Sequence, residues 1–186
     1  MADATARQQR SDERRRGILD AARARAESDG WSAVTTRHLA DAIGYTQPVL
    51  YGHFPGGKTE IMRTIALEGF VELAARCRTA VGRTTARRAV EAVAGAYVQF
   101  AAEHPAVYEA MFQQPIDARF ASEDSATELR QGFAVLAEAV GEHGDGTKTE
   151  VFWGALHGIA QLELAGRMNA DHRTHRIREI GALFGS

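Results

Sequence analysis

Apolar residues recur every three or four positions along most of this 186-residue chain, and alternation of polar and apolar residues is nowhere sustained. The first spacing matches the 3.6-residue period of an α-helix, whereas a half-buried strand needs strict alternation. Only four prolines interrupt the pattern, and alanine, the best helix former, is abundant. The sequence therefore predicts an all-α fold and gives strands almost no support.

Glycine, proline and capping residues divide this pattern into about nine helices. Their expected bounds are 11–29, 35–43, 47–54, 59–81, 85–103, 105–113, 123–142, 148–168 and 172–184. The polar residues 1–10 are expected to fray, as chain ends without apolar anchors do. Thr147 and Glu150 have the spacing of a capping box at the start of the eighth helix. We expect three parts: a head over 11–58, a linking helix over 59–81 and a helical body over 82–186.

Composition and charge are those of a folded globular protein, with 45% hydrophobic and 25% charged residues. No stretch reaches the roughly 18 apolar residues of a membrane-spanning helix, and the first residues lack the apolar core of a signal peptide. We therefore expect a cytoplasmic protein. The net charge of −2 conceals a weak asymmetry, because residues 1–65 carry 10 basic and 8 acidic side chains and residues 66–186 carry 12 and 16. The single cysteine, Cys77, rules out an internal disulfide.

Two short helices joined by the turn Gly44-Tyr45-Thr46 are the feature with the clearest functional meaning. This arrangement is a helix-turn-helix, whose second helix can lie in the major groove of DNA. Leu50 and Phe54 lie four residues apart and can face the core, so the other side chains of that helix point elsewhere. Amide and guanidinium groups suit adenine and guanine edges, and small apolar groups suit the thymine methyl. The sequence therefore predicts a DNA-reading surface on this helix.

The segment VTTRHLADAIGYTQPVLYGHFPGGKT, residues 34–59, resembles the N-terminal domain of the tetracycline-repressor (TetR) family. It contains the family's threonine-capped helix, Ala-x-x-x-Gly turn, Tyr-x-His-Phe recognition helix and following lysine, and the match covers about residues 11–70. The resemblance implies base contacts by Arg37, Gln47, Pro48 and Val49, and phosphate contacts by Thr36, Tyr51, His53 and Lys58. Two features depart from the family pattern: Gly52 replaces a larger side chain, and the spacing from Phe54 to Lys58 is one residue longer.

The same resemblance implies how such a protein works. It implies an all-α homodimer whose head binds a palindromic operator in double-stranded DNA. A fourth helix would join the head to a body that dimerises and binds a small-molecule effector. The expected function is transcriptional regulation, with repression that the effector relieves.

The body shows a looser resemblance, over residues 152–166, to the penultimate helix of a TetR subgroup with characteristic Trp, His and Gly residues. Gly154, Gly158 and Gly166 would allow close helix approach, and the last two helices carry apolar stripes. We therefore expect a dimer interface formed by Phe152, Leu156, Ile159, Ile177, Ile180 and Phe184.

Large, partly polar side chains are concentrated in the body, which is the usual composition of a small-molecule site. The candidate effector-binding residues are Tyr97, Phe100, His104, Tyr108, Phe112, Phe133, Trp153 and His157. The alternative is that these residues are ordinary core aromatics and histidines. A cavity among them would favour the first interpretation.

Two alternatives to this function are open. The protein could be an enzyme, or it could be a helical ligand-binding or interaction protein that does not bind an operator. The sequence has no Walker loop, dinucleotide fingerprint, His-Glu-x-x-His motif or nucleophile elbow, so we expect no enzyme activity and no cofactor. His172 and His175, with Asp171 beside them, have a possible metal spacing. No third strong ligand is evident, so we expect no metal site. A protein that had lost DNA binding would not be expected to retain the whole set of polar DNA-contact candidates.

Overall fold

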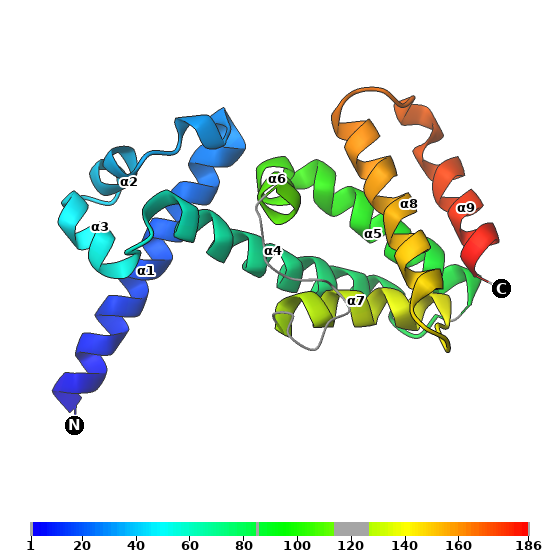
Figure 1. Cartoon of the computed structure of the whole chain (residues 1–186), viewed down its shortest axis with the longest axis horizontal. Coiled ribbons are helices and arrows are strands. Elements are labelled where there is room, and N and C mark those ends of the chain that lie inside the picture. The colour runs from blue at the N-terminus through cyan, green and yellow to red at the C-terminus, as the bar shows by residue number, and fades with distance from the viewer. Residues whose placement is uncertain (1, 85, 114–126, 186) are drawn as a thin grey trace.

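The structure of the chain, a computed structural model, describes residues 2–84, 86–113 and 127–185 (Figure 1). Within these ranges it contains nine α-helices and two 3-10 turns and no strand, so the predicted all-α fold is confirmed. The α-helices are α1 (Ala2–Asp29), α2 (Thr36–Ala42), α3 (Gln47–His53), α4 (Gly57–Val81), α5 (Arg87–Glu103), α6 (Pro105–Gln113), α7 (Thr127–Val140), α8 (Thr147–Leu164) and α9 (Arg173–Phe184). The 3-10 turns are Trp31–Ala33 and Ala170–His172.

Helices α1, α2 and α3 form a small head at one end of the molecule, and α4 runs from it into the body (Figure 1). The start of α2 is fixed by Thr35, whose side-chain oxygen accepts a hydrogen bond from the backbone N–H of His38 at 3.1 Å. Such a cap typically stabilises a helix by about 1 kcal/mol. Leu50 of α3 and Phe54, which directly follows α3, are fully buried, as their four-residue spacing predicts.

The body is organised around α4 and α5. Helix α4 packs against α5, α6 and α7, while α5 also packs against α8 and α9. One continuous apolar core joins the buried face of α1 to the far end of the body. Helices α4 and α6 approach each other closely at Gly69 of α4, where an added Cβ would lie 2.7 Å from Cγ1 of Val107 and 2.8 Å from Sδ of Met111. The absence of a side chain at Gly69 therefore lets α6 pack tightly on α4.

Two expectations about helix ends are wrong. Helix α1 already begins at Ala2, so residues 1–10 do not form a frayed end over the part described. Helix α8 ends at Leu164, because Gly166 adopts φ +64° and the Arg167 N–H bonds to the Leu162 carbonyl, which terminates the helix. Gly166 is therefore a helix-ending residue and does not lie in the helix interior.

The predicted capping box at the start of α8 does not form. Asp145 accepts a hydrogen bond from the Thr147 N–H at 3.0 Å, and Glu142 accepts one from the Thr149 N–H at 3.2 Å. These two carboxylates precede the helix and occupy its free amides, as anionic groups at helix N-termini commonly do. The first residues of the helix expected over 123–142 lie outside the described residues. None of the helices described has the length and apolar character needed to cross a membrane.

Candidate nucleic-acid interface and apolar pocket

The first turns of α2 and α3 present side chains to the outside of the head. Arg37, Gln47 and Pro48 are exposed, while Thr36 and Val49 are half-buried. Tyr51, one helical turn after Gln47 and Pro48, is 44% exposed. The buried face of α3 is thus the one anchored by Leu50, and the predicted base-reading side chains are free to reach a partner.

The extra residue between Phe54 and Lys58 has a local structural role. Gly57 adopts φ +59°, which a residue with a side chain rarely does, and an added Cβ would lie 3.3 Å from Cε1 of Tyr51. The added Cβ would also lie 3.8 Å from Cγ2 of Thr36. Gly57 therefore brings together Thr36 of α2, Tyr51 of α3 and the start of α4, which places two predicted phosphate-contact residues side by side.

The Lys58 side chain and the backbone carbonyl of His53 are engaged within the head. The Lys58 ammonium donates a hydrogen bond to the carbonyl of Trp31, and its side chain is half-buried. Arg15 donates to the His53 carbonyl at 2.9 Å, and its guanidinium carbon lies 4.1 Å from the Phe54 ring centroid. Lys58 is therefore the predicted phosphate-contact residue that the structure directs to another partner.

An apolar pocket lies in the body between α4, α5, α6, α7 and α8. Its cavity volume is about 20 Å³. About one water is all that such a volume holds, so the pocket is narrow in this conformation. Its lining comprises Phe70, Leu73, Ala74, Cys77, Tyr97, Phe112, Gly132, Phe133, Val135, Leu136 and Trp153.

A chain of hydrogen bonds begins at two residues that line the pocket, Tyr97 and Trp153. The Trp153 indole N–H donates to the Tyr97 hydroxyl at 3.1 Å, and the Tyr108 hydroxyl donates to the same oxygen at 3.0 Å. Nδ1 of His157 lies 2.8 Å from the Tyr108 hydroxyl. Burial raises the pKa of both tyrosines and lowers that of His157, so these three side chains are neutral at physiological pH.

The structure brings together six of the eight predicted effector-binding residues. Four of them line the pocket, and Tyr108 and His157 join it through the hydrogen-bond chain. Phe100 and His104 lie elsewhere: Nε2 of His104 is 2.8 Å from a guanidinium nitrogen of Arg76, and the Arg76 guanidinium carbon lies 5.4 Å from the Phe100 ring centroid. Contrary to the prediction, these two residues are therefore not part of the pocket. The pocket residues of α4 were not predicted. An apolar stripe on a linking helix has the same sequence pattern whether it packs against other helices or lines a cavity.

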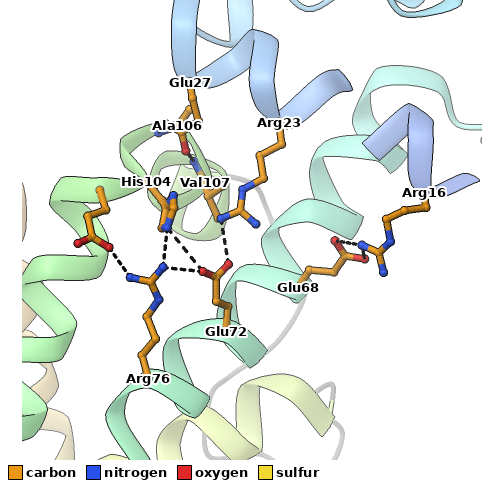
Figure 2. Close-up of polar contacts among 10 residues, drawn as sticks. Arg16, Arg23, Glu27, Glu68, Glu72, Arg76, His104, Ala106 and Val107 are labelled. Atoms are coloured by element: carbon orange, nitrogen blue, oxygen red, sulfur yellow. Dashed lines mark hydrogen bonds and ion pairs between the residues drawn. The ribbon is translucent and has the colours of Figure 1, made fainter. Parts of the chain in front are cut away.

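The junction between head and body is polar and specific (Figure 2). The Glu27 carboxylate of α1 accepts hydrogen bonds from the N–H groups of Ala106 and Val107, at 3.0 and 3.1 Å. The Trp31 indole donates to the Ala106 carbonyl at 2.7 Å. Glu27 thus caps the start of α6, the helix that carries Tyr108 to the pocket.

Ion pairs also connect α1 with α4 (Figure 2). Arg16 pairs with Glu68 at 3.1 Å, and Arg23 pairs with Glu72 at 2.9 Å. Glu72 pairs in addition with Arg76 at 2.9 Å, which itself bonds to Glu103 of α5. Glu72 therefore links the head to α4 at the level of the pocket, while Arg76 continues the connection into the body.

We predict that Glu72→Gln destabilises the protein at neutral pH but less at acid pH. Burial raises the pKa of Glu72, but the hydrogen bonds from Arg23 and Arg76 and the charges of Arg23 and His104 outweigh it, so the pKa is lowered overall. A lowered pKa means that the contribution to stability is complete above the ordinary carboxyl range and is lost as pH falls through the folded-state value. The expected loss is about 1 kcal/mol at neutral pH.

Urea unfolding of Glu72→Gln at neutral pH and at a pH of about 3 measures this difference. Glu68→Gln is the control, because Glu68 has a single arginine partner and a more exposed side chain. Equal losses of stability at both pH values would contradict the prediction.

The predicted dimer residues divide into two groups. Phe152 and Leu156 of α8 are 0% exposed in the single protomer, so they belong to its core. Ile180 is also buried, while Ile159, Ile177 and Phe184 are half-buried. The exposed large apolar side chains on these helices are Val151, Leu162, Leu164 and Leu183.

Two family models match this chain. Residues 18–65 match the model described as bacterial regulatory proteins of the tetR family, and residues 90–182 match a tetracyclin repressor-like C-terminal domain. The chain belongs to the TetR family. The first match covers the head with its helix-turn-helix, and the second covers the body, so this TetR-family protein is a transcriptional regulator with a DNA-binding N-terminal domain.

Individual relatives agree with this membership. An HTH-type transcriptional regulator of Mycobacterium tuberculosis is 29% identical over 161 residues, which are 83% of this chain and 72% of that protein. A second HTH-type regulator, from Bacillus subtilis, is 31% identical over 102 residues, which are 55% of this chain and 53% of that protein. Among solved structures, a TetR transcriptional regulator from Rhodococcus sp. RHA1 has a TM-score of 0.67 and 23% identity, over 95% of this chain and 97% of the other. That similarity is one of fold.

Proposed function

We propose that this TetR-family regulator binds a palindromic DNA operator as a homodimer, represses transcription, and leaves the operator when a small molecule occupies the apolar pocket. The observation that carries the DNA-binding part is that α2 and α3 expose four predicted contact residues together, namely Arg37, Gln47, Pro48 and Tyr51. A guanidinium, an amide and an apolar ring are the groups that read guanine, adenine and the thymine methyl in the major groove. Because bacterial DNA would be its target, the protein would act in the cytoplasm.

Arg37→Ala and Gln47→Ala are expected to weaken binding to the preferred operator by about 1–3 kcal/mol each and to relax base preference at one position per half-site. Lys58→Ala should act differently, because its ammonium supports the Trp31 carbonyl inside the head. It should lower thermal stability and leave the salt dependence of DNA binding nearly unchanged. Binding to operators with single-base changes, measured over a salt series, distinguishes these effects. A salt slope smaller by roughly 0.9 per lost phosphate contact for Lys58→Ala would restore its role at the phosphate.

The outer faces of α8 and α9 support the homodimer. Val151, Gly154, Gly158 and Leu162 follow one another at helical spacing on α8, and an added Cβ at either glycine would meet no atom within 4 Å of it in the protomer. Glycine in a helix interior costs about 1 kcal/mol relative to alanine, so two open glycines on an apolar stripe favour close packing against a second copy. Leu183 on α9, 71% exposed, extends this surface. A two-fold dimer would present two heads and hence bind a palindrome.

Release of the operator would follow from the position of α4, which contacts both the pocket of the body and the head. Phe70, Leu73 and Ala74 of α4 line the pocket, while Glu72 on the same turns pairs with α1 of the head. A molecule larger than the pocket must move apart the helices that line it, which include α4. Two recognition helices must lie about 34–36 Å apart to enter successive major grooves, so a small displacement of α4 is sufficient to misplace them. Such a molecule acts only if it binds the displaced conformation more tightly.

The whole proposal is tested by selecting DNA from a random pool and then screening small molecules for those that release the selected DNA. We expect a palindromic sequence to be enriched and at least one compound to lower its affinity. A protein that enriches no sequence but still binds compounds would be a ligand-binding protein without operator binding. Enrichment of a sequence that no compound releases would remove the effector from the proposal.

A further inference from the structure

We infer that the effector pocket takes an uncharged, predominantly apolar molecule that carries one neutral oxygen acceptor. This inference rests on the proposed function, since it names the chemical class of the molecule that would occupy the pocket. Among the described residues that line the pocket, ten have apolar or aromatic side chains and the eleventh is Gly132. None of the described residues that line the pocket is Asp, Glu, Lys or Arg.

The groups of the pocket that could carry a charge are held neutral. Burial raises the pKa of the Cys77 thiol to about 12 and also raises the pKa of Tyr97. His157, behind Tyr108, has its pKa lowered by burial. A carboxylate or ammonium entering this site would lose its hydration without meeting an opposite charge among the lining residues that the structure describes, and such a transfer is strongly unfavourable.

The polar end of the pocket offers one hydrogen-bond donor. The Tyr97 oxygen accepts from both the Trp153 indole and the Tyr108 hydroxyl, so its own hydrogen is available to a bound molecule. That hydroxyl belongs to a residue that lines the pocket and is otherwise fully buried. A carbonyl oxygen on an apolar body would accept this hydrogen without introducing a charge.

Gly132 is a position at which a larger side chain can block the pocket. An added Cβ at Gly132 meets no atom within 4 Å, and the residue lies within α7, where glycine is a poorer helix former than either alanine or leucine. Gly132→Leu should therefore fold, and its side chain should take up the little space that the narrow pocket offers. Gly132→Ala is the matched control, because it gains the same helix propensity but adds a single carbon.

The test uses two sets of matched probes and the full, DNA-free chain. One set is methyl naphthyl ketone, ethylnaphthalene, naphthoate and naphthylmethylammonium; the other is methyl octyl ketone, decane, decanoate and decylammonium. Binding is measured by equilibrium dialysis for the wild type, Gly132→Leu and Gly132→Ala. In at least one set the ketone should bind about tenfold or more tightly than either ion and more tightly than the hydrocarbon. Gly132→Leu should lose this binding and Gly132→Ala should keep it.

Several outcomes would overturn the inference. These are binding of either ion as tightly as the ketone, no preference for the ketone over the hydrocarbon, ketone binding that survives Gly132→Leu, and no ketone binding to the wild type. The comparison among probes uses the wild type alone and so does not depend on how a variant folds. Because no DNA is present, this test can fail independently of the proposed regulation. The proposed regulation would fail if a ketone binds to the protein but the selected operator stays bound.

Discussion

Leu156→Glu is expected to prevent the protomer from folding. Leu156 lies on the inner face of α8 with 0% of its surface exposed, in contact with the continuous core. Truncating such a residue typically costs about 2–5 kcal/mol, and a buried unpaired carboxylate costs more. That loss is comparable with the whole stability of a typical protein, about 5–15 kcal/mol. Circular dichroism and limited proteolysis should show loss of helix and rapid digestion, whereas a folded monomer would place Leu156 at a dimer seam after all.

Leu183→Glu is expected to leave the protomer folded but to separate the dimer. Leu183 is 71% exposed on α9, so the new carboxylate stays hydrated in the monomer and would be buried only against a second copy. Losing the paired heads should weaken operator binding by about 10²–10⁴-fold, because the second head no longer binds as part of the same molecule. Sedimentation and operator titration at matched concentrations measure both effects.

The control for this second prediction is Ala182→Glu, at the neighbouring exposed position of α9. A carboxylate there adds the same charge to the helix without removing the large apolar side chain of Leu183. We expect Ala182→Glu to weaken the dimer less than Leu183→Glu does. A Leu183→Glu variant that remains dimeric would move the interface away from this part of α9.

The helix-turn-helix of the head could be predicted from the sequence, because its signals are local. Thr35 caps α2 through a residue three positions away, and Leu50 and Phe54 lie on one face of a single turn. Contacts of this kind depend only on helix geometry, which a short segment determines by itself. The partner of Lys58 could not be predicted in this way, since the Trp31 carbonyl lies 27 residues away in the chain.

The outer face of α8 shows why the body was harder to predict. Phe152 and Leu156 point into the core, while Val151 and Leu162 point outward, and both pairs are apolar at helical spacing. A helix that is apolar on opposite faces does not indicate by its sequence which face meets its own protomer.

The pocket presented the same difficulty as α8. His104 lies near the other predicted effector-binding residues in the sequence, but Arg76 of α4 holds it in the polar junction. Arg76 is 28 residues away from His104 in the chain. Helical periodicity predicts which residues share a face of one helix, and it does not predict which side chain of another helix meets them.

Hydroxyl-radical footprinting of the protein on its selected DNA asks whether two heads of one dimer read two half-sites. We expect two protected stretches on one face of the duplex, with centres about 10–10.5 base pairs or a multiple of that apart. Arg37→Ala should weaken both stretches equally, because the dimer contributes the same residue to each half-site. A single protected stretch for each bound dimer, or no protection at any selected sequence, would show that the two heads do not read an operator together.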